Sequence, residues 1–402
     1  MASKSRSAPL FSRNQLRLLV WGLPIVILLL SLSGPGDAPE TVITADPEGR
    51  VYQQTLPQQT LFRLHLIAAR EPRIGAPAQL RQRLLSRALQ ARLRQPGELG
   101  DWLQTQGWTL QLQEYAGYRR LELESPGPVT SEQLKSFLQQ LQTPPQADWQ
   151  RLLQQVQAEQ YLSRQNAEAW LHSQTPQEED RVLTIDPIAD YRQQLDPGHW
   201  RLTLTGPEPL SLQLPVVTPA EAGPQVSASV RLSLQPLPVE PPVGPRLTLH
   251  RWRLPPIHTP DDFARLLLGR ELVIQTLALW LEQPQSQDAG LGYSLHWEPA
   301  QGGGLASLLL TGAPWPHLPE WLPQQIGQAD LDSARHQLLA QLETATDLQP
   351  WIDLLALYRL PADSLQQLPG QLAEITPQAM QHWLQLALHS LLWVGSITSP
   401  PK

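Results

Sequence analysis

The sequence predicts an α+β fold of two similar α/β-sandwich halves, each an antiparallel sheet packed with helices, behind an N-terminal membrane segment. From about Val51 onward, apolar residues recur by turns at the two-residue period of strands and at the 3.6-residue period of helices. A proline-rich passage from Pro236 to Pro245 interrupts this pattern, and the same kind of plan then starts again. With 402 residues and 41% hydrophobic content, the chain can bury more than one core.

The expected organisation has six segments. They are a basic cytoplasmic segment (1–17), a transmembrane anchor or signal peptide (18–33), a linker (34–50), a first half (51–235), a proline-rich linker (236–246) and a second half (247–402). Two similar halves joined by such a linker suggest an ancient duplication.

The N-terminal sequence predicts a segment that targets the chain to a membrane. Lys4, Arg6, Arg13 and Arg17 precede an apolar run over residues 18–32. That run spans about 22 Å as a helix, which is short against a bilayer core of roughly 30 Å. A short anchor, a cleaved signal peptide and a buried helix therefore all stay open. For an anchor or a signal, the positive-inside rule places the bulk of the chain in the periplasm, at a bacterial-type inner membrane.

The first half begins with a strand at 61–67, where polar and apolar residues alternate. Pro77 suits the first turn of a helix, whose apolar face carries Leu80, Leu84, Leu85, Leu89 and Leu93. Strands at 109–113 and 119–123 are joined by a turn near Gly117, and residues 130–133 cap a helix carrying Leu134, Phe137, Leu138 and Leu141. A long helix is expected from Asp148 to His172, with Leu152, Leu153, Val156, Tyr161 and Leu162 on its apolar side. A strand at 200–205 follows.

The second half repeats strands and helices in a similar order. Strand 247–254 precedes helix 261–282, and strands 292–298 and 305–311 pair across residues 301–304. Helices at 330–344, 349–358 and 377–389 lead into a closing strand at 391–397. The Gly302-Gly303-Gly304 run lacks the lysine and helix start of a phosphate loop, so a hairpin turn is favoured.

Composition excludes several classes of function. A net charge of -7 argues against a nucleic-acid partner, because phosphate binding needs clustered Lys and Arg. The absence of cysteine excludes disulfides, thiolate nucleophiles and Cys-type zinc sites. No G-x-S-x-G sequence supports a serine hydrolase. His382 and His389 could share a helix face, but no acidic partner is spaced to complete a zinc site, which favours a structural role.

Four features occur in an order that resembles a known family. They are the acidic-Pro turn at 68–75, Glu159 within Val-Gln-Ala-Glu, the Gly-x-x-Tyr-Ser strand start at 289–294, and the closing segments 375–377 and 392–395. Together they resemble the pitrilysin or insulinase family of zinc peptidases, particularly the shorter two-domain members related to mitochondrial processing peptidase. The resemblance covers about residues 55–397, and it implies duplicated halves that enclose a chamber.

The positions that carry chemistry in that family are replaced here. An H-x-x-E-H motif supplies two zinc ligands and a general base, and the resemblance aligns Gln79, Gln82 and Arg83 with them and Glu159 with the distal Glu ligand. An amide oxygen binds zinc weakly, a guanidinium stays protonated, and an amide cannot accept a proton from water. The sequence therefore predicts no catalytic residue, no metal and no cofactor.

Two residues remain as site candidates. The resemblance assigns Tyr293 to peptide contact, although Ser286 stands near the position of the family's arginine. Arg83 is expected to fill the vacant metal position, and pairing with Glu159 is geometrically plausible. Three simpler interpretations stay open: an exposed helix face for 79–83, a core or strand-edge aromatic for Tyr293, and a surface carboxylate for Glu159.

The expected function is a membrane-tethered, catalytically silent peptidase homologue. The resemblance implies that such a subunit joins an active zinc peptidase and forms a wall that holds peptides or unfolded polypeptide. The alternative is an envelope scaffold or binding protein that works without any peptidase partner. An enzyme that uses unrecognised residues is a third possibility.

Overall fold

The computed structural model describes residues 42–70, 75–94, 98–115, 117–174, 183–215, 231–243, 246–283, 291–300, 302–312, 315–345 and 347–397. The chain from Ile43 onward forms one compact unit. Among the described residues, no helix combines the length and the hydropathy needed to cross a membrane. The predicted segments 1–17 and 18–33 lie outside the described residues. The predicted linker 34–50 contains a strand, because Ile43–Ala45 pairs with the strand that follows.

The first half is built on a six-stranded sheet with the order β1-β2-β7-β3-β5-β4. Its strands are β1 (Ile43–Ala45), β2 (Val51–Thr55), β3 (Phe62–Ala69), β4 (Thr109–Glu114), β5 (Tyr118–Ser125) and β7 (Trp200–Gly206). All neighbours pair antiparallel except β2 and β7, which pair parallel and so depart from the predicted antiparallel sheet. A separate pair is formed by β6 (Leu183–Ile185) and β8 (Leu232–Leu234).

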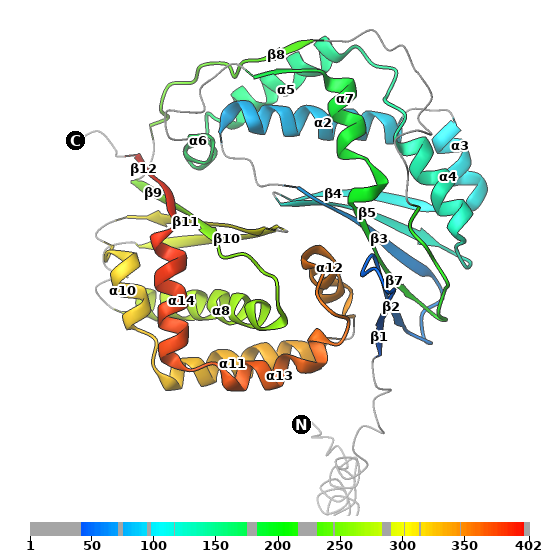
Figure 1. Ribbon diagram of the computed structural model, residues 1–402. Coiled ribbons are helices and arrows are strands. Elements are labelled where there is room, and N and C mark those ends of the chain that lie inside the picture. The colour runs from blue at the N-terminus through cyan, green and yellow to red at the C-terminus, as the bar shows by residue number, and fades with distance from the viewer. Residues whose placement is uncertain are drawn as a thin grey trace, which may run out of the picture. The chain divides into compact units, whose positions relative to one another are not determined.

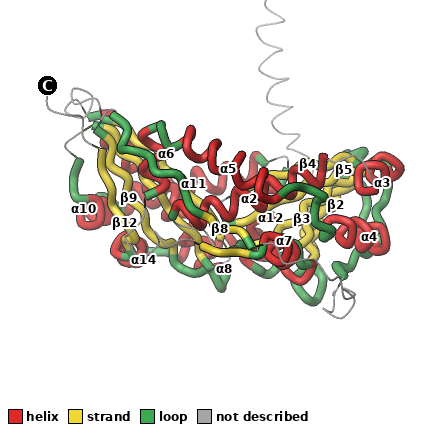
Figure 2. Tube along the Cα trace, turned by 90° about the horizontal axis from the view of Figure 1, so that it is seen from above, coloured by secondary structure: helices red, strands yellow, loops and turns green. Residues whose placement is uncertain are grey.

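Helices pack on one face of this sheet. They are α2 (Ala76–Arg94), α3 (Glu98–Gln106), α4 (Ser131–Leu141), α5 (Trp149–Ser163) and α7 (Pro187–Gln194), with a short 3-10 turn at Pro197–His199. Helix α6 (Ala167–Ser173) packs instead on strands of the second half. Leu64 and Leu66 of β3 point into the same core as Leu84 of α2 and Phe137 of α4. Burial of these side chains follows the predicted periods, because alternate residues of a strand share one face. Figures 1 and 2 show α5 lying beside α2.

The second half is built on a four-stranded antiparallel sheet with the order β10-β11-β9-β12. Its strands are β9 (Leu247–Leu254), β10 (Gly292–Ala300), β11 (Gly303–Thr311) and β12 (Leu391–Ile397). Its helices are α8 (Pro260–Glu282), α10 (Leu318–Gln324), α11 (Gln328–Thr344), α12 (Gln349–Tyr358), α13 (Ser364–Glu374) and α14 (Pro377–His389). The hairpin at 302–304 is confirmed, since Gly304 has a φ of 127° and a side chain there would collide with the carbonyl of Glu298.

The two sheets share one strand order. Four strands of the first run β7-β3-β5-β4, and the strands of the second run β12-β9-β11-β10, so that strands of equal rank in chain order occupy equal places (Figure 1). In addition, one helix of each half packs on the sheet of the other half. Helix α12 contacts β7 and β3, on the sheet face opposite to α2, while α6 contacts β12 and β9, where Leu171 packs on Leu249 and Ile397.

A buried polar cluster between α12 and the first sheet joins the two halves. Asp353, 3% exposed, accepts hydrogen bonds from His65 Nδ1 at 2.8 Å, Arg120 Nη1 at 2.7 Å and Thr203 Oγ1 at 2.5 Å. Gln349 donates to the same carboxylate at 3.1 Å. Because His65, Arg120 and Thr203 belong to β3, β5 and β7, this carboxylate ties a helix of the second half to three strands of the first.

The predicted helix from Asp148 to His172 is wrong as one element. It is broken after Ser163, and α6 begins after Asn166, whose Oδ1 accepts the amide hydrogens of Glu168 at 2.9 Å and Ala169 at 3.3 Å. Such side-chain capping starts a new helix and competes with continuation of the old one. The buried stripe of α5 consists of Trp149, Leu153, Val156 and Gln160. Tyr161 and Leu162 are 38% and 64% exposed, contrary to the prediction.

The described part of the predicted proline-rich linker runs along α5 and α6. Backbone carbonyls of this linker, and of Gln235 just before it, accept hydrogen bonds from side chains: Gln157 Nε2 donates to Gln235 at 2.8 Å, Arg164 Nη1 to Leu237 at 3.0 Å and Trp170 Nε1 to Val239 at 3.4 Å. Because this segment belongs to no described helix or strand, these carbonyls take their partners from side chains of the neighbouring helices.

Candidate functional site

A cavity of about 790 Å³ lies between the two halves. A volume of this size is in the range that holds small ligands or short peptide segments. Its wall is formed by α2, β4, α5 and α6 of the first half and by β9, β10 and β11 of the second. The lining residues are Gln79, Gln82, Arg83, Ser86, Arg87, Gln90, Glu114, Glu159, Asn166, Glu168, Ala169, His172, Arg251, His296, Glu298 and Leu305.

Helix α2 presents the predicted motif positions to this cavity. Gln79, Gln82 and Arg83 lie three and four residues apart, so they share a helix face. Leu80 and Leu84, on the opposite side, are fully buried against the sheet. The amphipathic helix thus turns its polar face to the cavity, and the interpretation of 79–83 as a solvated face fits the same geometry.

Hydrogen bonds fix the motif side chains. Gln79 Nε2 donates to the carbonyl of His172 at 2.9 Å, and Arg83 Nη1 donates to Ser163 Oγ at 3.3 Å. Loss of surrounding water lowers the pKa of Arg83, while the charge of Glu159 acts in the opposite direction. Arg83 therefore lies near Glu159 on α5.

The ion pair of Glu159 differs from the expected one. Its carboxylate pairs with Arg87, one helical turn beyond Arg83, and Arg83 acts on it only through its charge. Arg87 shares the cavity-facing side of α2 and reaches across to α5 from a later turn. Both side chains are partly exposed, at 36% and 52%, so the pair adds little stability.

The chemistry of these four residues differs from that of a hydrolytic zinc site. They offer two amides, a guanidinium and one carboxylate, whereas a hydrolytic zinc site uses imidazoles and carboxylates. The amides can donate to and accept from a peptide backbone, and the arginine can pair with a carboxylate. This side of the cavity can therefore bind polar or acidic chain segments.

Tyr293 lies away from the cavity. On β10, Tyr293, Leu295 and Trp297 pack against the core of the second half, while His296 and Glu298, on the alternate face, line the cavity. The Tyr293 hydroxyl donates to the carbonyl of Ile274 on α8 at 3.2 Å, and partial burial raises its pKa. Its assignment to peptide contact stays a prediction without support from this cavity. Ser286 is outside the described residues.

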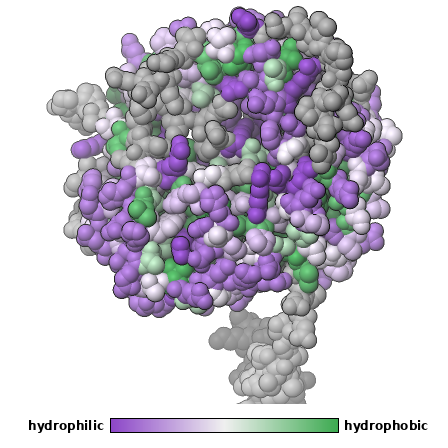
Figure 3. All heavy atoms as spheres, in the orientation of Figure 1, coloured by the Kyte–Doolittle hydropathy of each residue, from purple (hydrophilic) through white to green (hydrophobic). Residues whose placement is uncertain are grey.

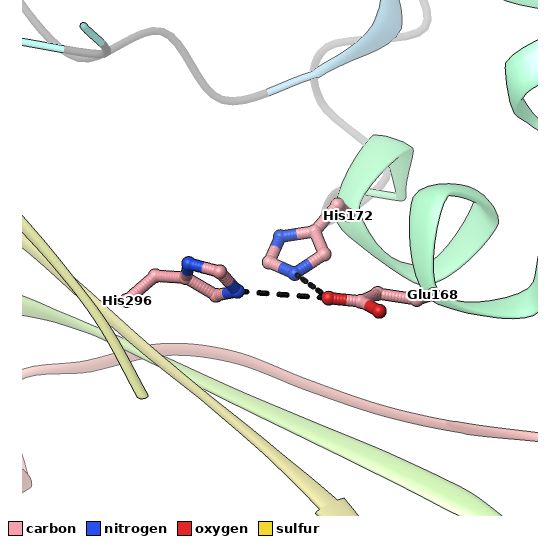
Figure 4. Close-up of side chains that lie close together, drawn as sticks. All are labelled: Glu168, His172 and His296. Carbon is pink, nitrogen blue, oxygen red and sulfur yellow. Dashed lines mark ion pairs between the residues drawn. The ribbon is translucent and has the colours of Figure 1, made fainter. Parts of the chain in front are cut away.

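Another part of the cavity wall, next to Gln79, holds a cluster absent from the sequence-based predictions. Glu168 and His172 of α6 and His296 of β10 point toward one another (Figure 4). Glu168 and His172 are spaced i,i+4 on a helix, a pattern that could have been found in the sequence. His296 could not, because it is brought in by the packing of one half against the other.

Arg251 of β9 lies behind this cluster. It is 5% exposed, and its Nη2 donates to both the Nδ1 and the carbonyl of His172, each at 2.7 Å. Burial and then the charges of Arg251 and His296 lower the pKa of His172 to about 4, so its ring is neutral near pH 7. Burial likewise raises the pKa of Glu298, although Arg251 acts against the shift.

The fold is shared with solved peptidase structures. The inactive domain of an M16 peptidase from Pseudomonas fluorescens superposes with a TM-score of 0.54 and 16% identity, over 90% of this chain and 100% of that one. A protease from Helicobacter pylori gives a TM-score of 0.57 at 12% identity, over 89% and 98%. The periplasmic protease PqqL from Escherichia coli gives 0.51 at 12% identity, over 94% of this chain and 51% of that one. No protein-family model and no curated protein sequence matches the chain.

The architecture is thus the α+β fold of the M16 peptidases, as the resemblance to pitrilysin and insulinase predicted. The chain corresponds to about half the length of PqqL. At these identities the likeness defines the fold alone.

Proposed function

We propose that this protein is a catalytically inactive M16-type peptidase homologue that supplies a peptide-binding wall to an active zinc peptidase. The proposal rests on the side chains that α2 turns toward the cavity. Helix α2 lies beside α5, and the resemblance assigns Gln79, Gln82 and Arg83 to the positions of two imidazoles and a general base. A retained scaffold without its chemistry is suited to binding.

The internal symmetry of the two sheets supports the duplication that the sequence suggested. The equal strand order of the two sheets, and the exchange of α6 and α12 between the halves, are what two copies of one ancestral unit would produce. In such an arrangement a cavity forms where the copies face each other, and either copy can lose its chemistry while keeping its wall.

The charges of the cavity support a peptide as its occupant. Arg83 and Arg87 on one side and Glu114, Glu168 and Glu298 on the others offer partners of both signs. An unfolded chain presents backbone donors and acceptors together with side chains of either charge, so a mixed polar wall can hold many sequences. Tethering to an inner membrane through residues 18–33 is the further part of this proposal, and it rests on the sequence pattern alone.

An envelope scaffold that works without a peptidase is the second candidate. Exposed apolar side chains on separate elements favour it, among them Leu162 at 64% and Leu386 at 59% exposure. On the face seen in Figure 3, hydrophilic residues predominate and apolar ones occur in small separate groups. Such groups can act as anchors in contacts with several partners.

Affinity purification from native membranes decides between these candidates. The full-length chain is cross-linked in its own cells and recovered with its neighbours, which are identified by mass spectrometry. A bait of residues 1–50 fused to an unrelated domain serves as the control for membrane neighbourhood. We expect a homologue with an intact H-x-x-E-H motif, enriched over the control. Recovery of envelope assembly factors without any peptidase would refute the partner role and establish the scaffold.

A further inference from the structure

The strongest unassigned feature is the cluster of Glu168, His172 and His296. We propose that these three side chains form a binding site for a divalent transition metal ion, with zinc as the reference ion. The site is separate from the family's metal position on α2 and α5, since none of its ligands is on either helix. It therefore goes beyond the proposed function.

The geometry fits three ligands of one ion. Glu168 Oε1 lies 3.9 Å from His172 Nε2 and 3.6 Å from His296 Nε2, and all three donor atoms lie within 4.8 Å of one another. Tetrahedral zinc, with bonds of about 2.0–2.2 Å, places neighbouring ligand atoms roughly 3.3 Å apart. Side-chain movements of less than about 1 Å would bring the donors to that spacing. Two imidazoles and one carboxylate, with the fourth position open, form a common set for zinc and related ions.

The three residues lie on a capped helix and on a paired strand. Asn166 caps α6 and fixes the turn that carries Glu168 and His172. His296 is held by the pairing of β10 with β11. The side chains of Glu168, His172 and His296 are 44%, 25% and 48% exposed, so an ion can reach the site from the cavity.

Arg251 opposes metal binding and provides a test. A guanidinium always donates, so its bond to Nδ1 makes that nitrogen the acceptor and leaves the proton of a neutral His172 on Nε2. Coordination through Nε2 must displace that proton, and Nδ1 must then carry one, which breaks the bond to Arg251. The guanidinium keeps its bonds to the His172 carbonyl and to Ser307 Oγ. Metal binding thus competes with one hydrogen bond and one positive charge.

The test uses the full-length chain without an affinity tag, stripped with chelator and titrated with Zn²⁺ by calorimetry at pH 7.5. We expect one Zn²⁺ per chain. Glu168→Gln and His296→Ala should each weaken binding at least about tenfold, because each removes a direct ligand, whereas loss of a mere outer partner already costs 10–100-fold. His336→Ala, at an exposed histidine of α11, is the matched control and should bind as the unchanged chain does.

Arg251→Gln should tighten Zn²⁺ binding by about tenfold, since it removes the positive charge and its amide oxygen can accept a hydrogen bond from Nδ1–H. If that variant does not fold, His172→Ala replaces it and should weaken Zn²⁺ binding at least about tenfold, because it removes the third direct ligand. Absence of binding, or equal binding by the unchanged chain, Glu168→Gln and His296→Ala, would overturn the proposal.

Discussion

The identity of three side chains on one helix face determines what the cavity can do. Gln79, Gln82 and Arg83 were predicted from the sequence to share a face, and the structure turns that face to the cavity. The helical period determines this, because positions three and four apart lie together. The partner of Glu159 was not predictable in the same way. Arg83 and Arg87 lie one turn apart on the same face of α2, so spacing alone does not decide which of them pairs with Glu159. The packing of α2 on α5 selects Arg87.

Restoring the motif tests the residue-level alignment. The substitutions Gln79→His, Gln82→Glu and Arg83→His, made together in the His296→Ala background, should give a chain that binds one Zn²⁺. The new imidazoles would lie one turn apart on the cavity face, with Glu159 on the neighbouring helix as third ligand. The His296→Ala background removes the second candidate site, so any zinc bound reports on α2. Calorimetric titration measures it.

Adding Glu159→Gln to the restored chain is the control. It should weaken zinc binding about tenfold or more if α5 supplies a ligand. A restored chain that folds, by circular dichroism, but binds no zinc would show that Gln79, Gln82 and Arg83 do not align with the H-x-x-E-H positions.

Elements with strong periodicity were predictable, and short ones were not. The bounds of α12, α14, β9 and β12 agree with the sequence prediction because long apolar patterns and proline starts mark them clearly. The elements β1, β2, β6, β8, α3, α7, α10 and α13 were missed. These are short, or lie between prolines, and tertiary contacts rather than local pattern stabilise them. At the boundary between α5 and α6, the side chain of Asn166 caps the new helix.

Asn166→Ala should destabilise the protein by about 1 kcal/mol, because the amide groups of Glu168 and Ala169 in the first turn of α6 lose the side-chain oxygen that caps them. Urea unfolding followed by circular dichroism measures the change. Gln165→Ala, at the exposed neighbouring position, is the matched control and should stay within about 0.5 kcal/mol of the unchanged chain. Equal stability of both variants would mean that packing of Leu171, not the cap, determines where α6 begins.

At the scale of the molecule, the two halves depend on each other. Tyr52 of β2 donates its hydroxyl hydrogen to the carbonyl of Leu360 at 2.8 Å, and Asp353 gathers hydrogen bonds from three strands of the first sheet. Gly117, in the β4–β5 turn, lies so close to Pro299 and Ala300 that a side chain would not fit. The sequence predicted two halves and a linker, but not these contacts, because they join residues hundreds of positions apart. The residues from Ile43 onward should therefore unfold as one unit.

Asp353→Ala tests this coupling. Removal of the carboxylate takes from the buried His65 and the half-buried Arg120 the partner that they share, which should cost about 3–5 kcal/mol. Scanning calorimetry should show one transition, shifted as a whole to lower temperature. Asp101→Ala, at an exposed position of α3, should leave the transition nearly unchanged. Two separate transitions, of which one is shifted, would show that the halves unfold independently.

The same carboxylate predicts how stability depends on pH. Burial alone would raise the pKa of Asp353, but the hydrogen bond and charge of His65, with Thr203 and Arg120, outweigh it and lower the pKa below the ordinary value of 3.8. The unfolded chain then binds the proton more readily than the folded one, so the stabilisation is complete above about pH 5 and is lost as the pH falls through the lowered pKa. Asp353→Asn has no such group. The difference in unfolding free energy between it and the unchanged chain should therefore shrink as urea unfolding is measured at progressively lower pH below 4. A difference that stays constant down to pH 2 would mean that the carboxylate is not held in its charged form.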